Sequence, residues 1–97
     1  MAINQKLVLQ KFGENVKLVR KRAGISQEKL GLEIGLDRTY ISGIERGIRN
    51  PTLLIIAKIA DGLKVSILDL FAAEPNSIGN EANNETRNNE ERTTFTS

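Results

Sequence analysis

Arg38, Thr39 and Ser42 are the side chains whose type and spacing best suit the recognition of a nucleic-acid base. The guanidinium of Arg38 can donate two parallel hydrogen bonds, which is the geometry that reads the O6 and N7 atoms of a guanine. Thr39 can contact a thymine methyl group or a base edge, and Gly43 would allow a close approach to the groove floor. A simpler interpretation makes Arg38 a phosphate or solvent contact at a helix start and Gly43 a weak position in a helix.

The composition argues against an enzyme. The 97 residues contain no His and no Cys, so the commonest general base, thiol chemistry and disulfides are absent. No constellation of nucleophile, base and orienting group is visible, and we expect neither a metal nor a cofactor. No apolar run approaches the length of a membrane span, and we expect a cytoplasmic protein.

The segment that must position Arg38 runs from residue 26 to residue 47. Apolar residues recur three or four positions apart in each half, at Leu30 and Ile34 and at Ile41 and Ile44. Gly35 can end the first helix in the left-handed conformation, and Asp37 can cap the second. Gly31 lets the two helices cross closely. The segment therefore predicts two short helices joined by a tight turn, a helix-turn-helix.

Three further helices complete an all-α, five-helix domain over residues 1–73. The five helices are expected at 3–22, 27–33, 38 to 45 or 46, 52–63 and 67–72. The core stripe of the fourth is expected to be Leu53, Ile56, Ile59, Ala60 and Leu63. Residues 74–97 are poor in apolar side chains, which predicts a disordered acidic, Asn-rich tail.

These features resemble a known family. Gln27, Gly31, Gly35, Ile41, Ile44 and Glu45 stand at the spacing of the Cro and lambdoid-repressor (XRE) helix-turn-helix proteins. The run DRTYISGIERG followed by RNPT is similar to the restriction-modification controller proteins. The resemblance covers roughly residues 12–71. It implies a lambda-repressor-like fold and a sequence-specific transcriptional regulator, a dimer on an inverted-repeat operator with the helix from about Arg38 to Glu45 in the major groove.

Phosphate contacts should flank the base-reading helix and fix its register. The candidates are Gln27, Tyr40, Arg46, Arg49 and Asn50. Gln27 opens the helix before the turn, where free backbone N–H groups favour an anion. The alternatives are a helix-start polar residue without consequence for Gln27 and a solvated loop charge for Arg49.

The resemblance also implies a structural ion pair between Arg20 and Glu45. It would tie the first helix to the third and neutralise a carboxylate that would otherwise repel phosphate. We therefore expect a structural role for Glu45 and a large loss of stability when either partner is removed.

Spare apolar residues near the end of the domain predict a two-fold dimer interface. They are Leu54, Ile55, Leu68 and Phe71. The alternative is that these four residues belong to the core of a small domain.

The charge distribution favours a polyanionic partner for the domain. Residues 1–73 carry 12 Lys and Arg against 7 Asp and Glu, whereas residues 74–97 carry 2 against 5. The expected partners are double-stranded DNA and a second copy of the chain, with RNA polymerase as a further candidate. The tail is inert, binds a partner, or competes with DNA for the basic face.

Two other interpretations remain open at this point. The same domain could serve a phage repressor or an antitoxin. Alternatively, the helix-turn-helix is only a scaffold, and the fourth helix and the tail bind another protein.

Overall fold

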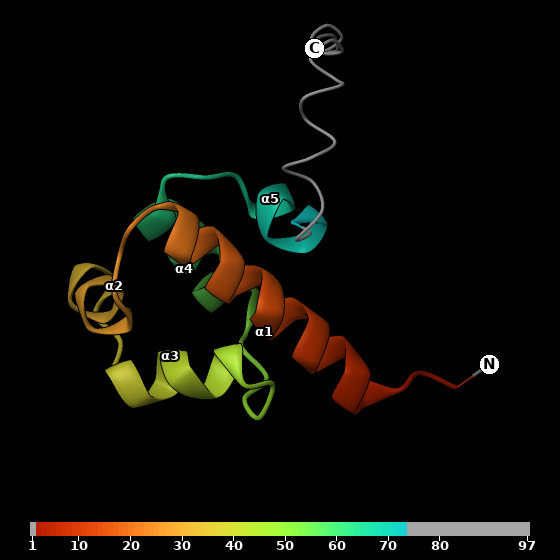
Figure 1. The fold of residues 1–97 in the computed structure, drawn as a ribbon. Coiled ribbons are helices and arrows are strands. Elements are labelled where there is room, and N and C mark those ends of the chain that lie inside the picture. The colour runs from red at the N-terminus through yellow and green to blue at the C-terminus, as the bar shows by residue number, and fades with distance from the viewer. Residues whose placement is uncertain (1, 74–97) are drawn as a thin grey trace, which may run out of the picture.

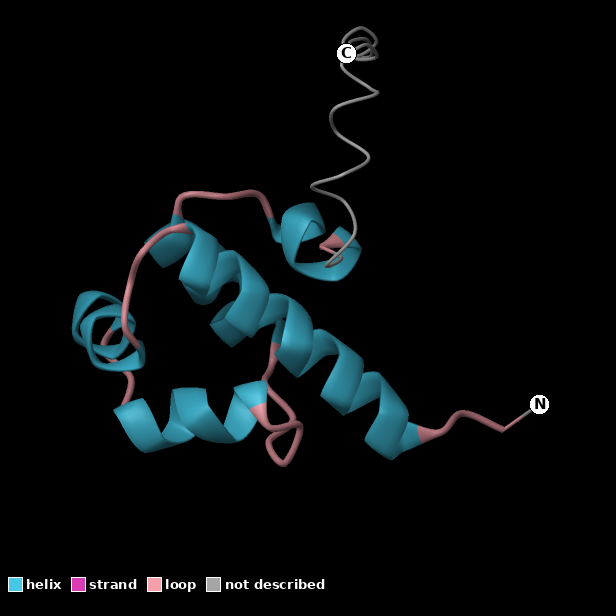
Figure 2. Cartoon of the chain, viewed as in Figure 1, coloured by secondary structure: helices cyan, strands magenta, loops and turns pink. Residues whose placement is uncertain are grey.

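The computed structural model describes residues 2–73, which form five α-helices (Figures 1 and 2). The helices are α1 (Gln5–Arg22), α2 (Gln27–Ile34), α3 (Arg38–Glu45), α4 (Leu53–Leu63) and α5 (Ile67–Ala72). These bounds lie within two residues of those expected, and the all-α class is confirmed for the described part of the chain. The prediction about the tail, residues 74–97, lies outside the described residues.

A polar side chain caps the start of every helix. The caps are Asn4, Ser26, Asp37, Thr52 and Ser66, and each accepts a hydrogen bond from a backbone N–H of the first turn. Such a bond satisfies one of the backbone donors that a helix start leaves without an intrahelical partner. Short polar residues placed before apolar stripes therefore explain why the bounds could be read from the sequence.

The long helix α1 packs against α3 and α5, while α2 packs against α3 and α4, and α4 against α5. Figure 1 shows the helices surrounding the centre of the domain, with α3 lying along one side and running from α2 towards the middle of α1. The core is aliphatic apart from one aromatic ring. Its buried apolar residues are Phe12, Val16, Val19, Leu30, Ile41, Ile44, Ile59, Ala60, Leu63 and Leu70.

Two glycines permit the closest approaches between elements. A Cβ added to Gly31 would lie 2.4 Å from the carbonyl oxygen of Leu36 in the turn and 3.3 Å from Cδ1 of Ile41 on α3, so only glycine allows the predicted close crossing of α2 and α3. A Cβ on Gly13 would lie 2.3 Å from the carbonyl oxygen of Ile44. Gly13 thus lets α1 touch the backbone at the end of α3, a role that sequence reasoning missed.

The expected core stripe of α4 is wrong at its first residue. Leu53 is exposed, and the buried residues of α4, Ile59, Ala60 and Leu63, lie in its second half. The first turn of α4 comes directly after the loop from α3, and both of its leucines, Leu53 and Leu54, are exposed. Leu53 therefore joins the exposed apolar residues of α4.

Candidate nucleic-acid interface

The turn between α2 and α3 sets the direction of α3 relative to α2. Gly35 ends α2 with φ of +75°, and the N–H of Leu36 donates to the carbonyl of Gly31 over 2.9 Å. Asp37 then caps α3 by accepting from the backbone N–H and the hydroxyl of Thr39, at 2.9 and 3.0 Å. These hydrogen bonds hold the pKa of the Asp37 carboxyl below its ordinary value. The hydrogen bonds from Thr39 thus favour the ionised form of the cap.

A buried ion pair fixes the far end of α3 to α1. The Nε of Arg20 donates to Oε2 of Glu45 over 2.6 Å, and its Nη2 donates to Oε1 over 3.1 Å. The two side chains are 8% and 3% exposed. Arg20 also donates to the carbonyl of Ile25 over 2.7 Å, so the guanidinium spans three elements of the fold. The pair is bidentate, the strongest geometry for these two groups.

Gln27 connects this ion pair to the start of α3. Its Nε2 donates to Oε1 of Glu45 over 2.9 Å, and its Oε1 accepts from Nη1 of Arg38 over 3.1 Å. Gln27 is half-buried, whereas Arg38 is exposed. The sequence placed these residues in separate roles, and the structure joins them in one hydrogen-bonded chain.

The side chain of Arg49 packs against α3 at Gly43. A Cβ on Gly43 would lie 2.6 Å from Cγ of Arg49, so the arginine stem crosses α3 at the glycine. The guanidinium carbon then lies 5.7 Å from the centre of the Tyr40 ring, within range of a cation–π contact. The loop arginine is thereby held beside the outer face of α3, an arrangement that the sequence did not predict.

The other candidate residues occupy different environments on and after α3. Thr39, Arg46 and Asn50 are exposed, and Ser42 is half-buried. Because the hydroxyl of Thr39 donates its proton to Asp37, its oxygen can only accept from an outside partner, and its methyl group remains for an apolar contact. The candidates extend from the start of α3 to the loop after it.

The residues expected at a dimer interface divide into two kinds. Leu54 and Leu68 are each 75% exposed and so do not belong to the core. Ile55 is partly buried against the core. Phe71 is exposed, yet its ring packs on that of Phe12 with 5.1 Å between centroids.

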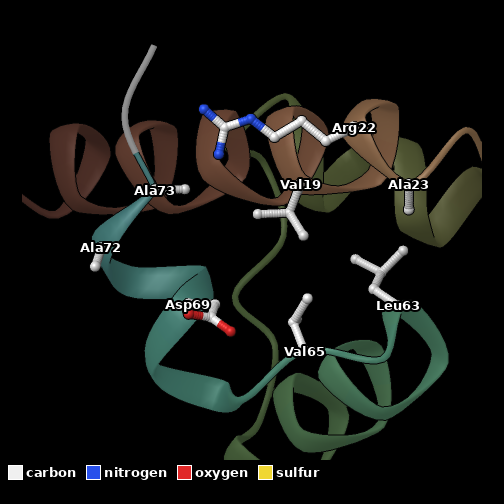
Figure 3. A pocket seen from close by; sticks show the side chains of 8 residues that line it. All are labelled: Val19, Arg22, Ala23, Leu63, Val65, Asp69, Ala72 and Ala73. Atoms are coloured by element: carbon white, nitrogen blue, oxygen red, sulfur yellow. The ribbon is translucent and has the colours of Figure 1, made fainter. Parts of the chain in front are cut away.

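A hollow lies between α1, α4 and α5 (Figure 3). Val19, Leu63 and Val65 point toward one another there. The carboxylate of Asp69 accepts from the backbone N–H of Ser66 and completes the capping box at the start of α5. Asp69, one of the polar residues that line the hollow, therefore has a structural role. Within residues 2–73, we find no helix able to cross a membrane and no cluster of potential metal ligands.

The five helices and the capped turn between α2 and α3 define a helix-turn-helix domain. The sequence model of the family described as Helix-turn-helix matches residues 16–70, and the chain belongs to this family. The predicted XRE-type domain is confirmed.

Among characterised proteins, the chain is similar to the control protein C.BamHI of Bacillus amyloliquefaciens. The two are 47% identical over 70 residues, which cover 71% of this chain and 84% of the relative. The structure is similar to that of the restriction-modification controller C.AhdI from Aeromonas hydrophila, with a TM-score of 0.66 and 43% identity over 67% of this chain and 98% of that one.

A second solved structure shows a controller protein with DNA. It is the tetramer of C.Esp1396I in complex with its natural 35 base-pair operator. The TM-score is 0.61 and the identity 44%, covering 66% of this chain and 84% of that one. The expected resemblance to restriction-modification controllers is thus confirmed.

Proposed function

We propose that this helix-turn-helix protein regulates transcription in the cytoplasm by binding an inverted-repeat operator as a dimer, with α3 in the major groove. The exposed guanidinium of Arg38 at the start of α3, held from within the domain, carries the proposal. N-terminal residues of a recognition helix are those that reach base edges. C.Esp1396I, of similar sequence and fold, has been solved with its operator, which supports DNA as the ligand.

The side chains divide into two sets on this proposal. Arg38 reads a guanine, and the methyl group of Thr39 contacts a thymine methyl. Ser42 completes the base-facing side of α3, whereas Gly43 is buried beneath the stem of Arg49 and would act by holding that side chain against the helix. Phosphates are contacted around it by Gln27, Tyr40, Arg46, Arg49 and Asn50.

The domain would dimerise through α4 and α5. We call Leu53, Leu54 and Leu68 the α4–α5 patch, three leucines exposed to solvent on two helices that pack together. Ile55, which is partly buried, and Phe71, whose exposed ring packs on Phe12, would support it. A two-fold axis through this patch would place two copies of α3 on successive turns of a DNA duplex.

The direct test of this function is selection of bound sequences from a random pool of DNA duplexes, followed by titration of the selected site at several salt concentrations. We expect a two-fold symmetric site whose affinity falls steeply with salt, by about 0.9 log units per log unit for each phosphate neutralised. No enrichment, with only weak salt-sensitive binding, would contradict the proposal. It would favour the helix-turn-helix as a scaffold for a protein partner.

The dimer interface is tested by placing a charge in the α4–α5 patch. Leu54→Glu and Leu68→Glu should each shift the protein from dimer to monomer at micromolar concentration, because an unpaired carboxylate would be buried at the interface. Mass in solution, from sedimentation or light scattering, gives the readout. Leu32→Glu is the matched control, since Leu32 is as exposed but lies on α2. Unchanged mass in both patch variants would exclude this interface.

Gly43→Ala tests the effect on DNA binding separately from the effect on stability. Removing a glycine from the interior of a helix favours the helix by about 1 kcal/mol, so the variant should unfold no more easily than the wild type. The new Cβ would displace the stem of Arg49 from α3 and its guanidinium from Tyr40. Affinity for the selected site should therefore fall while the melting temperature holds. A variant that binds as tightly as the wild type would show that Gly43 and the Arg49 side chain packed on it do not contribute to the interface.

A further inference from the structure

The base-reading arginine is joined to the interior of the protein by a continuous chain of hydrogen bonds. It runs from the guanidinium of Arg20 through the carboxylate of Glu45 and the amide of Gln27 to the guanidinium of Arg38. The first two residues are buried, Gln27 is half-buried and Arg38 is exposed. Gln27 is thus the link through which the rigid interior contacts a side chain at the surface.

The two neighbours of Gln27 dictate the orientation of its amide. A carboxylate can only accept hydrogen bonds, so the NH₂ group must face Glu45. A guanidinium can only donate, so the carbonyl oxygen must face Arg38. Glutamate at this position would place a second carboxylate beside Glu45, and lysine or arginine would place a second cation beside Arg38. An uncharged amide satisfies both neighbours at once.

We propose that Gln27 is a positioning residue, which holds Arg38 in its base-reading orientation by tying it to the buried Arg20–Glu45 pair. This inference rests on the proposed function, in which Arg38 reads a base. It gives Gln27 a role beyond the phosphate contact expected from the sequence.

The geometry leaves Arg38 able to bind DNA while it is held. A guanidinium has five N–H donors, and the bond to Gln27 engages a donor on Nη1 alone. Nε and Nη2 keep their hydrogens and can donate in parallel to a guanine. Holding the side chain before DNA arrives removes part of the entropy cost of ordering it at the interface.

A double-mutant cycle between Gln27 and Arg38 tests the inference. The proteins are the wild type, Gln27→Met, Arg38→Met and the double variant, each titrated with the selected operator and with the same duplex changed at the guanine that Arg38 reads. Gln5→Met is the matched control. Gln5 also directly follows a helix cap, but it is exposed and takes no part in the series of hydrogen bonds from Arg20 to Arg38. Methionine keeps the length of the side chain and removes both of its hydrogen bonds.

We expect Gln27→Met to lower the discrimination between the two duplexes by about two- to tenfold for each half-site, the effect of immobilising one long side chain. In the Arg38→Met background, the same substitution should change the discrimination no further. Gln5→Met should match the wild type throughout.

Two results would overturn the inference in different ways. An equal loss of affinity for both duplexes, present with and without Arg38, would make Gln27 a phosphate contact only. Discrimination unchanged by Arg38→Met would contradict the base-reading role itself and the inference with it.

A second readout needs no DNA. Nitrogen NMR relaxation of the Arg38 side chain in the free protein should show restricted motion in the wild type and Gln5→Met, and fast motion in Gln27→Met. A guanidinium equally mobile in all three proteins would contradict the positioning role. Because Gln27 is only half-buried, we expect the variant to fold, and its melting curve checks this.

Discussion

Replacing Arg20 by methionine is expected to lower the free energy of unfolding by about 3–5 kcal/mol, since it strands a buried carboxylate without its partner. Glu45 is 3% exposed in the ion pair and cannot recover its hydration without local opening. The substitution also frees the carbonyl of Ile25, which accepts from Arg20 in the wild type. For a domain of this size, such a loss is a large fraction of the total stability.

Denaturation in urea and thermal melting measure the change. Lys17→Met is the control, because Lys17 is an exposed residue of the same helix. The double variant with methionine at both Arg20 and Glu45 should recover much of the loss, since no charge is then left buried. An unchanged midpoint in Arg20→Met would show that the ion pair contributes nothing to the fold.

Arg38→Ala is expected to abolish the preference for guanine at one position of each half-site. A bidentate contact of this kind contributes about 1–3 kcal/mol of discrimination, which corresponds to about 5- to 150-fold in affinity ratio. A dimer loses this contact in both half-sites, so the combined effect on the operator is larger. Titration of the selected site and of its guanine-substituted form measures the ratio.

Arg46→Ala provides the contrast for Arg38. As a phosphate contact, Arg46 should contribute similarly to all sequences, and its removal from both subunits of the dimer should lower the salt slope by about two units, about 0.9 for each phosphate contact. Arg38→Ala should instead change the sequence preference with little change in slope. If Arg38→Ala weakened every duplex equally, Arg38 would be a phosphate contact and another residue would read the guanine.

The helices and the turn could be predicted because their signals are local. A cap, an apolar stripe and a terminating glycine lie within a few residues of one another, as Asp37 and Gly35 do around the turn. Leu53 shows the limit of this reasoning. Leu53 stands at the correct spacing for the apolar stripe of α4. Its burial, however, depends on where the neighbouring helices end, and the spacing of residues within one helix gives no information about that.

The connections within the site depend on how the helices cross. Gln27, Arg38 and Glu45 were each singled out from the sequence, yet residues on α2 and α3 had to be brought together before their hydrogen bonds could be known. The contact between the Arg49 side chain and Gly43 likewise could not be predicted without knowing the path of the loop after α3. Gly13 had no signal of its own, because a glycine inside a helix does not reveal what lies against it.

The two sides of α3 have separate tasks, and this separation bears on how the domain can evolve. Ile41, Ile44 and Glu45 are buried and secure the helix, while Arg38 and Thr39 are exposed. The residues proposed to read bases can therefore be exchanged with little effect on stability. A new operator preference could arise by a few substitutions on the outer side of α3, while a scaffold common to many regulators stays intact.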